Sequence, residues 1–270
     1  MERRGGLWFG WSGAVTERAD APAFAQRGRI GYATLDLTEA EHRGYYTGYS
    51  NGVLWPMLHS LPHLMSFRRQ DLEIYRRVNR RFAEHLAPLI QQGDRVWIHD
   101  YHLMCLPGCL RLRGIKNPTG FYLHVPFPSP DAAAVAPGIR GLMQDVLASD
   151  LIGFQTDTDR LAFQDYITRE VRGVIEPDGS LTAYGQNFRA GVYPIGVVPD
   201  EIQQLAEGYK GRAHPMRRAT DTRRQTIISV DRLDYSKGLP QRFCGYGQLL
   251  ARYPGHRSRV SYLQVTPISR

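Results

Sequence analysis

Two cations with a fixed spacing give the sequence its clearest chemistry. Arg232 and Lys237 lie five residues apart, between a β-branched run at 225–230 that predicts a strand and a helical repeat that follows it. The free N–H groups and the dipole of a helix N-terminus also favour negative charge. The spacing therefore indicates an anion site of a kind that would hold a diphosphate. A solvated loop, in which Arg232 pairs with Asp231 or Asp234, stays open as the alternative.

A second group of polar and aromatic residues lies where predicted strands end. Asp100 and His124 each close an apolar run, and ligands of open α/β sheets bind outside the carboxyl ends of strands. We therefore expect both side chains to contact a ligand. Aromatic faces combined with carboxylate and imidazole groups suit sugar rings, and the chain offers Trp11, Tyr45, Tyr46 and Trp55. Trp8 and Trp97 are assigned to the core instead, because tryptophan is highly buried on average.

The histidines and carboxylates do not predict a metal site. On a strand, His99 points away from Asp100, and a fourth ligand is not apparent. Asp157 and Asp159 form a D-x-D pattern, but they open a predicted helix and are better explained as its N-cap and first-turn acid. The sequence has no P-loop and no G-x-S-x-G elbow, which excludes P-loop kinases and serine hydrolases. No metal or other cofactor is expected.

The elements that would position these residues alternate between strands and amphipathic helices. This alternation predicts an α/β fold with a parallel sheet covered on both faces. The expected strands are 30–37, 95–100, 120–125, 151–155 and 193–197. A long helix between the first two carries Ile74, Val78, Phe82 and Leu86 on one face, with Arg76, Arg77, Arg80 and Arg81 exposed to water on the others. The turn residues at 177–179 predict a small hairpin.

Three segments follow from this pattern. Residues 1–198 form a first Rossmann-like domain, 199–224 a linker, and 225–270 the start of a second Rossmann-like domain. One βαβ unit cannot cover both of its faces, so we expect the C-terminal part to be incomplete.

Composition excludes some functional classes. A hydrophobic content of 42% with 22% charged residues is typical of a folded globular protein. The net charge of +8 would suit nucleic acid or a phosphorylated small substrate, but the basic stretch at 210–224 has no aromatic ladder for stacking bases. Three cysteines and no signal peptide favour a reducing, cytoplasmic setting, and no apolar run is long enough to cross a membrane. We therefore expect neither nucleic acid nor a membrane as partner.

Five motifs in a fixed order carry a family resemblance. They are Gly6–Gly13, Tyr45–Pro56, Trp97–Leu103, His124–Pro130 and Arg232–Pro240. With them the chain resembles the trehalose-6-phosphate synthases, which form glycosyltransferase family 20 and have the GT-B fold of two Rossmann-like domains. The resemblance implies retaining transfer of glucose from UDP-glucose to glucose 6-phosphate, without a metal ion.

The resemblance also implies a role for particular residues. His124 matches the imidazole that meets the donor glucose, and Arg232 and Lys237 match the catalytic pair that holds the donor diphosphate and stabilises the departing UDP. The implied acceptor-binding residues are Trp11, Tyr46, Trp55, Asp100 and Arg270. A homo-oligomer is implied for the full-length protein.

The chain departs from the family pattern at its two ends. Family members begin with a strand and a glycine loop that this sequence lacks, and they continue well past the arginine matched by Arg270. We therefore expect a chain truncated at both ends, with little transferase activity of its own. Two rival functions remain: a related glucosyltransferase with another acceptor, such as a glucosylglycerol-phosphate synthase that uses glycerol 3-phosphate, and a non-catalytic regulatory or assembly subunit.

Overall fold

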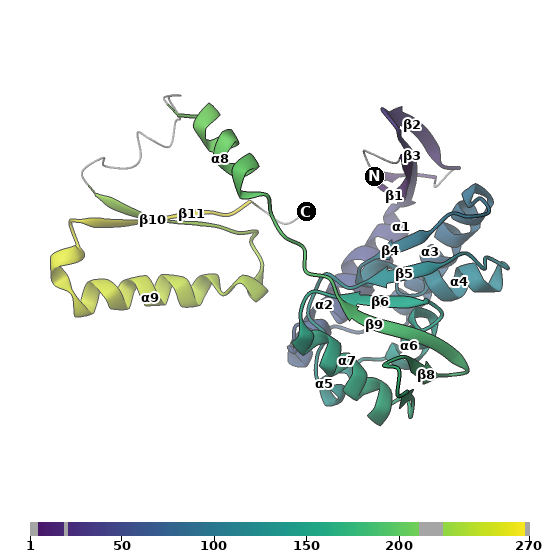
Figure 1. The fold of residues 1–270 in the computed structure, drawn as a ribbon. Coiled ribbons are helices and arrows are strands. Elements are labelled where there is room, and N and C mark those ends of the chain that lie inside the picture. The colour runs from purple at the N-terminus through teal and green to yellow at the C-terminus, as the bar shows by residue number, and fades with distance from the viewer. Residues whose placement is uncertain (1–4, 19–20, 211–223, 268–270) are drawn as a thin grey trace. The chain divides into compact units, whose positions relative to one another are not determined.

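The chain forms two compact units. The computed structural model describes residues 5–18, 21–210 and 224–267. The units are Met1–Ile195 and Gly196–Arg270, and the described part of each contains its own strands and helices (Figure 1).

The first unit is built on a six-stranded sheet with the order β4-β5-β6-β9-β8-β7 (Figure 1). Its parallel strands are β4 (Val96–His99), β5 (Thr119–Tyr122), β6 (Leu151–Phe154) and β9 (Gln186–Val192). The antiparallel strands β8 (Leu181–Ala183) and β7 (Val174–Ile175) confirm the predicted hairpin. Ile98, Phe121 and Ile152 are in register across three strands, and all three are buried in the core. Parallel strands between helices confirm the α/β class.

Most helices of the first unit contribute buried apolar residues to the core around this sheet. The longer ones are α3 (Arg69–Leu86), α4 (Leu106–Leu112), α6 (Ile139–Val146) and α7 (Asp157–Arg169), and the shorter ones are α1 (Glu39–Glu41), α2 (Trp55–Leu58) and α5 (Pro130–Ala134). The α3 repeat is confirmed, because Ile74, Val78 and Phe82 are all buried. The side chain of Thr156 caps α7 by accepting from the N–H of Asp159, so the predicted cap lies one residue earlier than Asp157.

The described residues also contain short helical turns and a π-helix. The π-helix is η1 (His42–Leu54), and the short turns are η2 (Pro62–Leu64), η3 (Ala87–Leu89), η4 (Tyr101–Leu103), η6 (Tyr235–Lys237) and η7 (Pro254–His256).

The exposed position predicted for Arg81 is wrong. Its side chain is only 15% exposed and lies 3.4 Å from the carboxylate of Glu41. It also donates to the carbonyl of Asp36 at 2.6 Å, so it ties α3 to the end of strand β3 (Ile30–Thr38). Helical periodicity places Arg81 off the apolar stripe but does not reveal a carboxylate brought there by another element.

Two strand predictions also need correction. Strand β3 exists, but it pairs with β1 (Gly6–Thr16) and β2 (Ala23–Arg27) in a separate three-stranded sheet. Residues 193–197 are not a strand. The strand that pairs with β6 is β9, which ends at Val192, and beyond it only the N–H of Tyr193 donates to β6, at the carbonyl of Phe154.

The assignment of two tryptophans to the core is wrong. Trp8 is 43% exposed on β1 and Trp97 is 67% exposed on β4. β4 is an edge strand, and Trp97 lies on the face opposite the buried Ile98. His99 occupies the same outer face, so in the described residues the sheet is not covered on both faces at this edge.

The second unit contains one βαβ unit preceded by helix α8 (Pro199–Gly208). Strands β10 (Gln225–Val230) and β11 (Val260–Val265) are parallel, and α9 (Leu239–Arg252) joins them, as predicted. Tyr262 of β11 contacts Phe243 and Tyr246 of α9. Among the described residues of this unit only Leu239 and Val260 are buried.

Most of the basic stretch at 210–224 lies outside the described residues. No described helix of either unit is both long and apolar enough to span a membrane.

Candidate functional site

The ends of β4 and β5 bring together the two polar residues expected to meet a ligand. These strands are parallel neighbours, so Asp100 and His124 follow them at the same edge of the sheet. The Oδ1 atom of Asp100 accepts a hydrogen bond of 3.2 Å from the backbone N–H of His124. This bond holds the carboxylate against the backbone of His124.

An unusual backbone conformation aims Asp100 at this edge. Its φ of 70° is positive, which is uncommon for a residue other than glycine and stores of order 1–3 kcal/mol of strain. The N–H of Asp100 still donates to the carbonyl of Tyr122 at 2.8 Å, which extends the β4–β5 ladder by one bond. Asp100 therefore turns the chain directly after the last backbone hydrogen bond between β4 and β5.

Burial dominates the electrostatics of Asp100. It raises the pKa of the carboxyl group, while N–H donors from His124 and Tyr101 and the charges of His124 and His59 act in the opposite direction without cancelling it. The side chain is therefore kept less acidic than an exposed aspartate, although it can still accept hydrogen bonds from sugar hydroxyls.

His124 also contacts a second histidine. The Nε2 atom of His124 lies 2.8 Å from Nδ1 of His99, the last residue of β4. His124 is half-buried, whereas His99 is exposed on the outer face of the sheet. His99 was weighed as a metal ligand and was not among the predicted site residues. Strand alternation could have placed it opposite Tyr122, but not against the ring of His124.

The three aromatic residues implied for the acceptor lie along one row of ring contacts. Ring centroids are 5.3 Å apart for Trp11 and Tyr46, and 5.4 Å apart for Tyr46 and His102. Tyr101 continues the row, with its centroid 4.0 Å from His102 and 5.7 Å from Trp55. The structure thus connects Trp11, Tyr46 and Trp55 through two residues of η4 that were not assigned to the site.

Two further histidines flank this row. His42 stacks on Tyr46 with a centroid distance of 5.4 Å, and His59 lies 4.1 Å from Trp55. Neither was predicted as a site residue, since each occurs in a helical or turn segment without a strand end beside it. Burial lowers the pKa of His102 to about 4, so the ring at the centre of the row is neutral at pH 7.

Close packing of η1 on α3 sets the position of Tyr46. A Cβ atom added at Gly44 would meet Cβ of Ile74 at 2.9 Å, and one at Gly48 would meet the carboxylate of Asp71 at 2.6 Å. Real side chains do not approach so closely, so these glycines allow the two helices to touch. Tyr46 lies between them in the chain and is held by this contact.

The two predicted cations belong to the second unit. They lie in the loop after β10, with Lys237 in η6 and Gly238 in the left-handed conformation that starts α9. Asp231 binds Arg242, and Asp234 caps the N–H of Ser236 at 2.8 Å. Burial alone would raise the pKa of Asp234, but the bonds from Ser236 and the charges of Arg232 and Lys237 lower it. Arg232 is exposed and Lys237 half-buried.

One predicted residue and one predicted absence remain without a test. Arg270 lies outside the described residues. Among the residues that the structure does describe, no three His, Cys, Asp or Glu side chains are grouped so that they could hold a metal ion.

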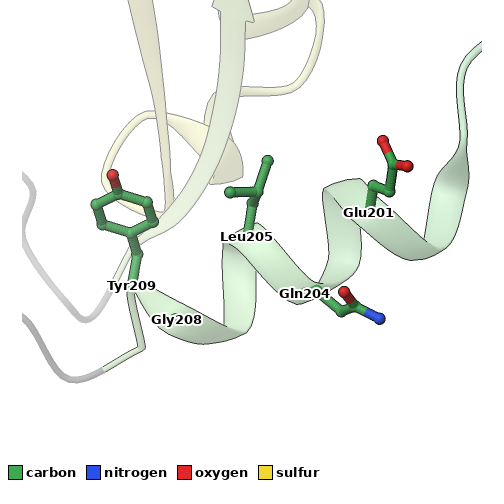
Figure 2. Close-up of a pocket in the computed structure, with 5 residues that line it drawn as sticks. All are labelled: Glu201, Gln204, Leu205, Gly208 and Tyr209. Carbon is green, nitrogen blue, oxygen red and sulfur yellow. The ribbon is translucent and has the colours of Figure 1, made fainter. Parts of the chain in front are cut away.

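The second unit also has a shallow hollow that none of the predicted site residues lines. It lies along α8 and is lined by Glu201, Gln204, Leu205, Gly208 and Tyr209 (Figure 2). Figure 2 shows Leu205 and Tyr209 pointing to the same side of the helix, while Gln204 points away. Leu205 and Tyr209 are 66% and 65% exposed, and the hollow contains none of the predicted site residues.

Comparisons with known proteins assign a family. The model of glycosyltransferase family 20 matches residues 1–270. The trehalose-6-phosphate synthase of Cronobacter sakazakii is 44% identical over 271 residues, which cover 100% of this chain and 57% of that protein.

Solved structures of high similarity agree. An α,α-trehalose-phosphate synthase (UDP-forming) from Burkholderia vietnamiensis has a TM-score of 0.96 at 45% identity, over 100% of this chain and 61% of its own. A homologue from Burkholderia xenovorans, solved in complex with glucose-6-phosphate, has a TM-score of 0.94 at 42% identity and the same coverage. These matches confirm the GT-B type of fold and the family resemblance. The chain spans about three fifths of the length of the relatives that it matches.

Proposed function

Since the chain belongs to glycosyltransferase family 20, we propose that the protein transfers glucose from UDP-glucose to glucose 6-phosphate. The products are α,α-trehalose 6-phosphate and UDP. The observation that carries this proposal is that the whole of this chain matches trehalose-6-phosphate synthases, one of them solved with glucose-6-phosphate. The rival acceptor and the non-catalytic subunit have no comparable support.

On the donor side, Arg232 and Lys237 bind the diphosphate of UDP-glucose. Negative charge on that diphosphate grows as the bond to glucose breaks, so two cations beside it bind the transition state more tightly than the ground state. Their place after a parallel strand, beside the N-terminus of α9, supports this role. His124 binds a hydroxyl of the donor glucose.

On the acceptor side, Asp100 and the aromatic row bind glucose 6-phosphate. Asp100 accepts hydrogen bonds from sugar hydroxyls, and Trp11, Tyr46 and Trp55 offer faces or polar edges to the sugar ring. The contact between Asp100 and His124 supports a shared task for the carboxylate and the imidazole. Arg270, implied to bind the acceptor phosphate, stays a proposal from the sequence.

The reaction then needs no protein nucleophile. The bond between glucose C1 and the diphosphate oxygen breaks, and the acceptor O1 forms its new bond to C1 on the same face. The proton of the acceptor hydroxyl passes to an oxygen of the departing phosphate, so configuration is retained and charge is balanced. We propose this path without a metal ion or another cofactor, and in the cytoplasm, a setting consistent with three cysteines that form no disulfide.

Product analysis tests the proposal. The protein, at the length at which the cell makes it, is incubated with UDP-glucose and either glucose 6-phosphate or glycerol 3-phosphate, and the products are identified by NMR. We expect α,α-trehalose 6-phosphate with the first acceptor and no new glycoside with the second. A product formed only from glycerol 3-phosphate would establish the rival enzyme, and no product from either would favour the non-catalytic subunit.

A further inference from the structure

The imidazole rings of His99 and His124 meet edge to edge. Their centroids are 5.1 Å apart and their planes are inclined by 22°, while Nδ1 of His99 is only 2.8 Å from Nε2 of His124. The two nitrogens therefore lie between the ring centres and face each other. At this distance one N–H must bridge them, because two lone pairs or two N–H groups would repel.

Both rings are held by the strands that carry them. His99 is the last residue of β4, and its ring lies 4.6 Å from that of Trp97 on the same face. The ring of Tyr122, the last residue of β5, is 4.6 Å from that of His124. The hydroxyl of Tyr122 donates to the carbonyl of Tyr193 at 2.6 Å, which fixes this ring in turn.

His124 is consequently restrained at two points. Asp100 accepts from its backbone N–H, and His99 occupies its Nε2 atom. Of the two ring nitrogens, only Nδ1 remains for a bond to a ligand. In histidines generally, the partner of one ring nitrogen decides whether the other is a donor or an acceptor.

We propose that His99 is a positioning residue, which holds Nε2 of His124 so that Nδ1 is the ring nitrogen that binds a hydroxyl of the donor sugar. The identity of that sugar rests on the proposed function, whereas the histidine pair does not. The pair shares the one bridging proton, so the choice of donor and acceptor in the bridge also sets the state of Nδ1.

Burial and the closeness of the two rings oppose a second positive charge on the pair. Burial and then the charge of His124 lower the pKa of His99. The other groups that face the two rings are the carboxylate of Asp100, the phenol of Tyr122 and, toward Asp100, the ring of His59. A doubly protonated pair would also lose its bridge, since neither nitrogen could then accept.

Nitrogen NMR of the 270-residue chain tests the pair directly. With ¹⁵N-labelled histidine, we expect a scalar coupling across the bridge between Nδ1 of His99 and Nε2 of His124 at neutral pH. His99→Phe, which keeps a flat ring, should shift the ring nitrogens of His124, and His99→Asn, which keeps a polar group, should shift them less. His63→Asn, at an exposed histidine, should leave them unchanged. Absence of the coupling, together with unchanged His124 nitrogens in His99→Phe, would overturn the proposal.

Kinetics of the protein at its cellular length test the consequence. His99→Phe should lower kcat about 10-fold with little change in the KM for glucose 6-phosphate, as expected when a residue acts through another group. His99→Asn should recover part of the loss. Unchanged kcat in His99→Phe would refute the role of the pair in an active enzyme. An inactive wild-type protein would instead refute the proposed function, and the NMR result would still decide whether the pair exists.

Discussion

At the scale of single residues, Asp100 combines a strained backbone with a buried carboxyl group. Because burial raises its pKa, folding favours the protonated form. The stabilisation from protonation is fully present below the ordinary carboxyl pKa and is lost as the pH rises through the raised value. At pH 7 the ionised side chain is therefore held against a penalty, as is common for residues kept for binding.

Asp100→Asn should separate stability from function. The amide oxygen can still accept from the N–H of His124, so we expect the first unit to be at least as stable at pH 7 as the wild type. Loss of a charged acceptor should weaken the binding of glucose 6-phosphate and so raise its KM by about 10- to 100-fold. Urea unfolding and initial rates measure the two effects, with Asp131→Asn as an exposed control. A variant that is less stable and unchanged in KM would contradict this assignment.

His102 predicts a loss of stability in acid. Its pKa is lowered from 6.5 to about 4, so the stability that it contributes is present above the unfolded pKa and is lost as the pH falls toward the folded value. His102→Phe keeps an aromatic ring between Tyr46 and Tyr101 without this proton. The stability of the variant relative to the wild type should therefore rise by about 3 kcal/mol between pH 7 and pH 4.

Tryptophan fluorescence can follow this unfolding in urea, because all four tryptophans lie in the first unit. A difference between variant and wild type that stays constant across this pH range would show that His102 is not buried as a neutral ring.

Part of the candidate site could be predicted from the sequence. Asp100 and His124 were expected at a common edge because both close apolar runs, and parallel strands end on one side of a sheet. The contact of His99 with His124 could not be predicted, since alternation gives the face of a side chain but not the ring that it meets. The roles of Arg232 and Lys237 rest on family resemblance, because their spacing alone suits a solvated loop as well.

At the scale of elements, contact between η1 and α3 holds the aromatic row. Gly44→Ala should destabilise the first unit by about 1–3 kcal/mol, because its new Cβ would meet the Cβ of Ile74 at 2.9 Å. Gly52→Ala is a matched control in the same element, since its Cβ would meet only Thr47 and Ser66 carbonyls at 3.4 and 3.5 Å. Urea unfolding followed by tryptophan fluorescence compares them, and equal stability of the two variants would contradict this packing.

Predictions of elements failed where the interacting residues lie far apart in the sequence. Residues 193–197 have a strand-like composition, but β6 is too short to pair with them. Arg81 lies off the apolar stripe of α3, yet its side chain is largely buried because it contacts the carboxylate of Glu41 and the carbonyl of Asp36. The long α3 repeat and the β10–α9–β11 unit were predicted correctly, because their patterns are local.

At the scale of the whole molecule, the two units differ in how much they bury. The first contains nearly all of the buried hydrophobic residues, whereas Ile228 and Val230 of β10 are each 64% exposed. Local opening is easiest where few apolar contacts must be broken. In the 270-residue chain, amides of β10 and β11 should therefore exchange with solvent faster than those of β5 and β6. Hydrogen exchange followed by mass spectrometry measures this, and equal protection of the two pairs would contradict it.

The family match extends over the whole chain, and each unit carries residues of the proposed reaction. The first unit supplies the residues proposed for the acceptor sugar, and the second supplies the cations proposed for the departing diphosphate. The role proposed for these cations is to stabilise the transition state, and not merely to line a solvated loop.

The most direct test is the turnover of Arg232→Ala in the protein at its cellular length, compared with Arg252→Ala. Arg252 is exposed in the last turn of α9 of the same unit, so its loss removes an equal charge away from the loop. UDP release from UDP-glucose and glucose 6-phosphate should fall on the order of 100-fold in kcat for Arg232→Ala. It should stay at the wild-type rate for Arg252→Ala. Full turnover in Arg232→Ala, or an equal loss in both variants, would rule out this role for Arg232.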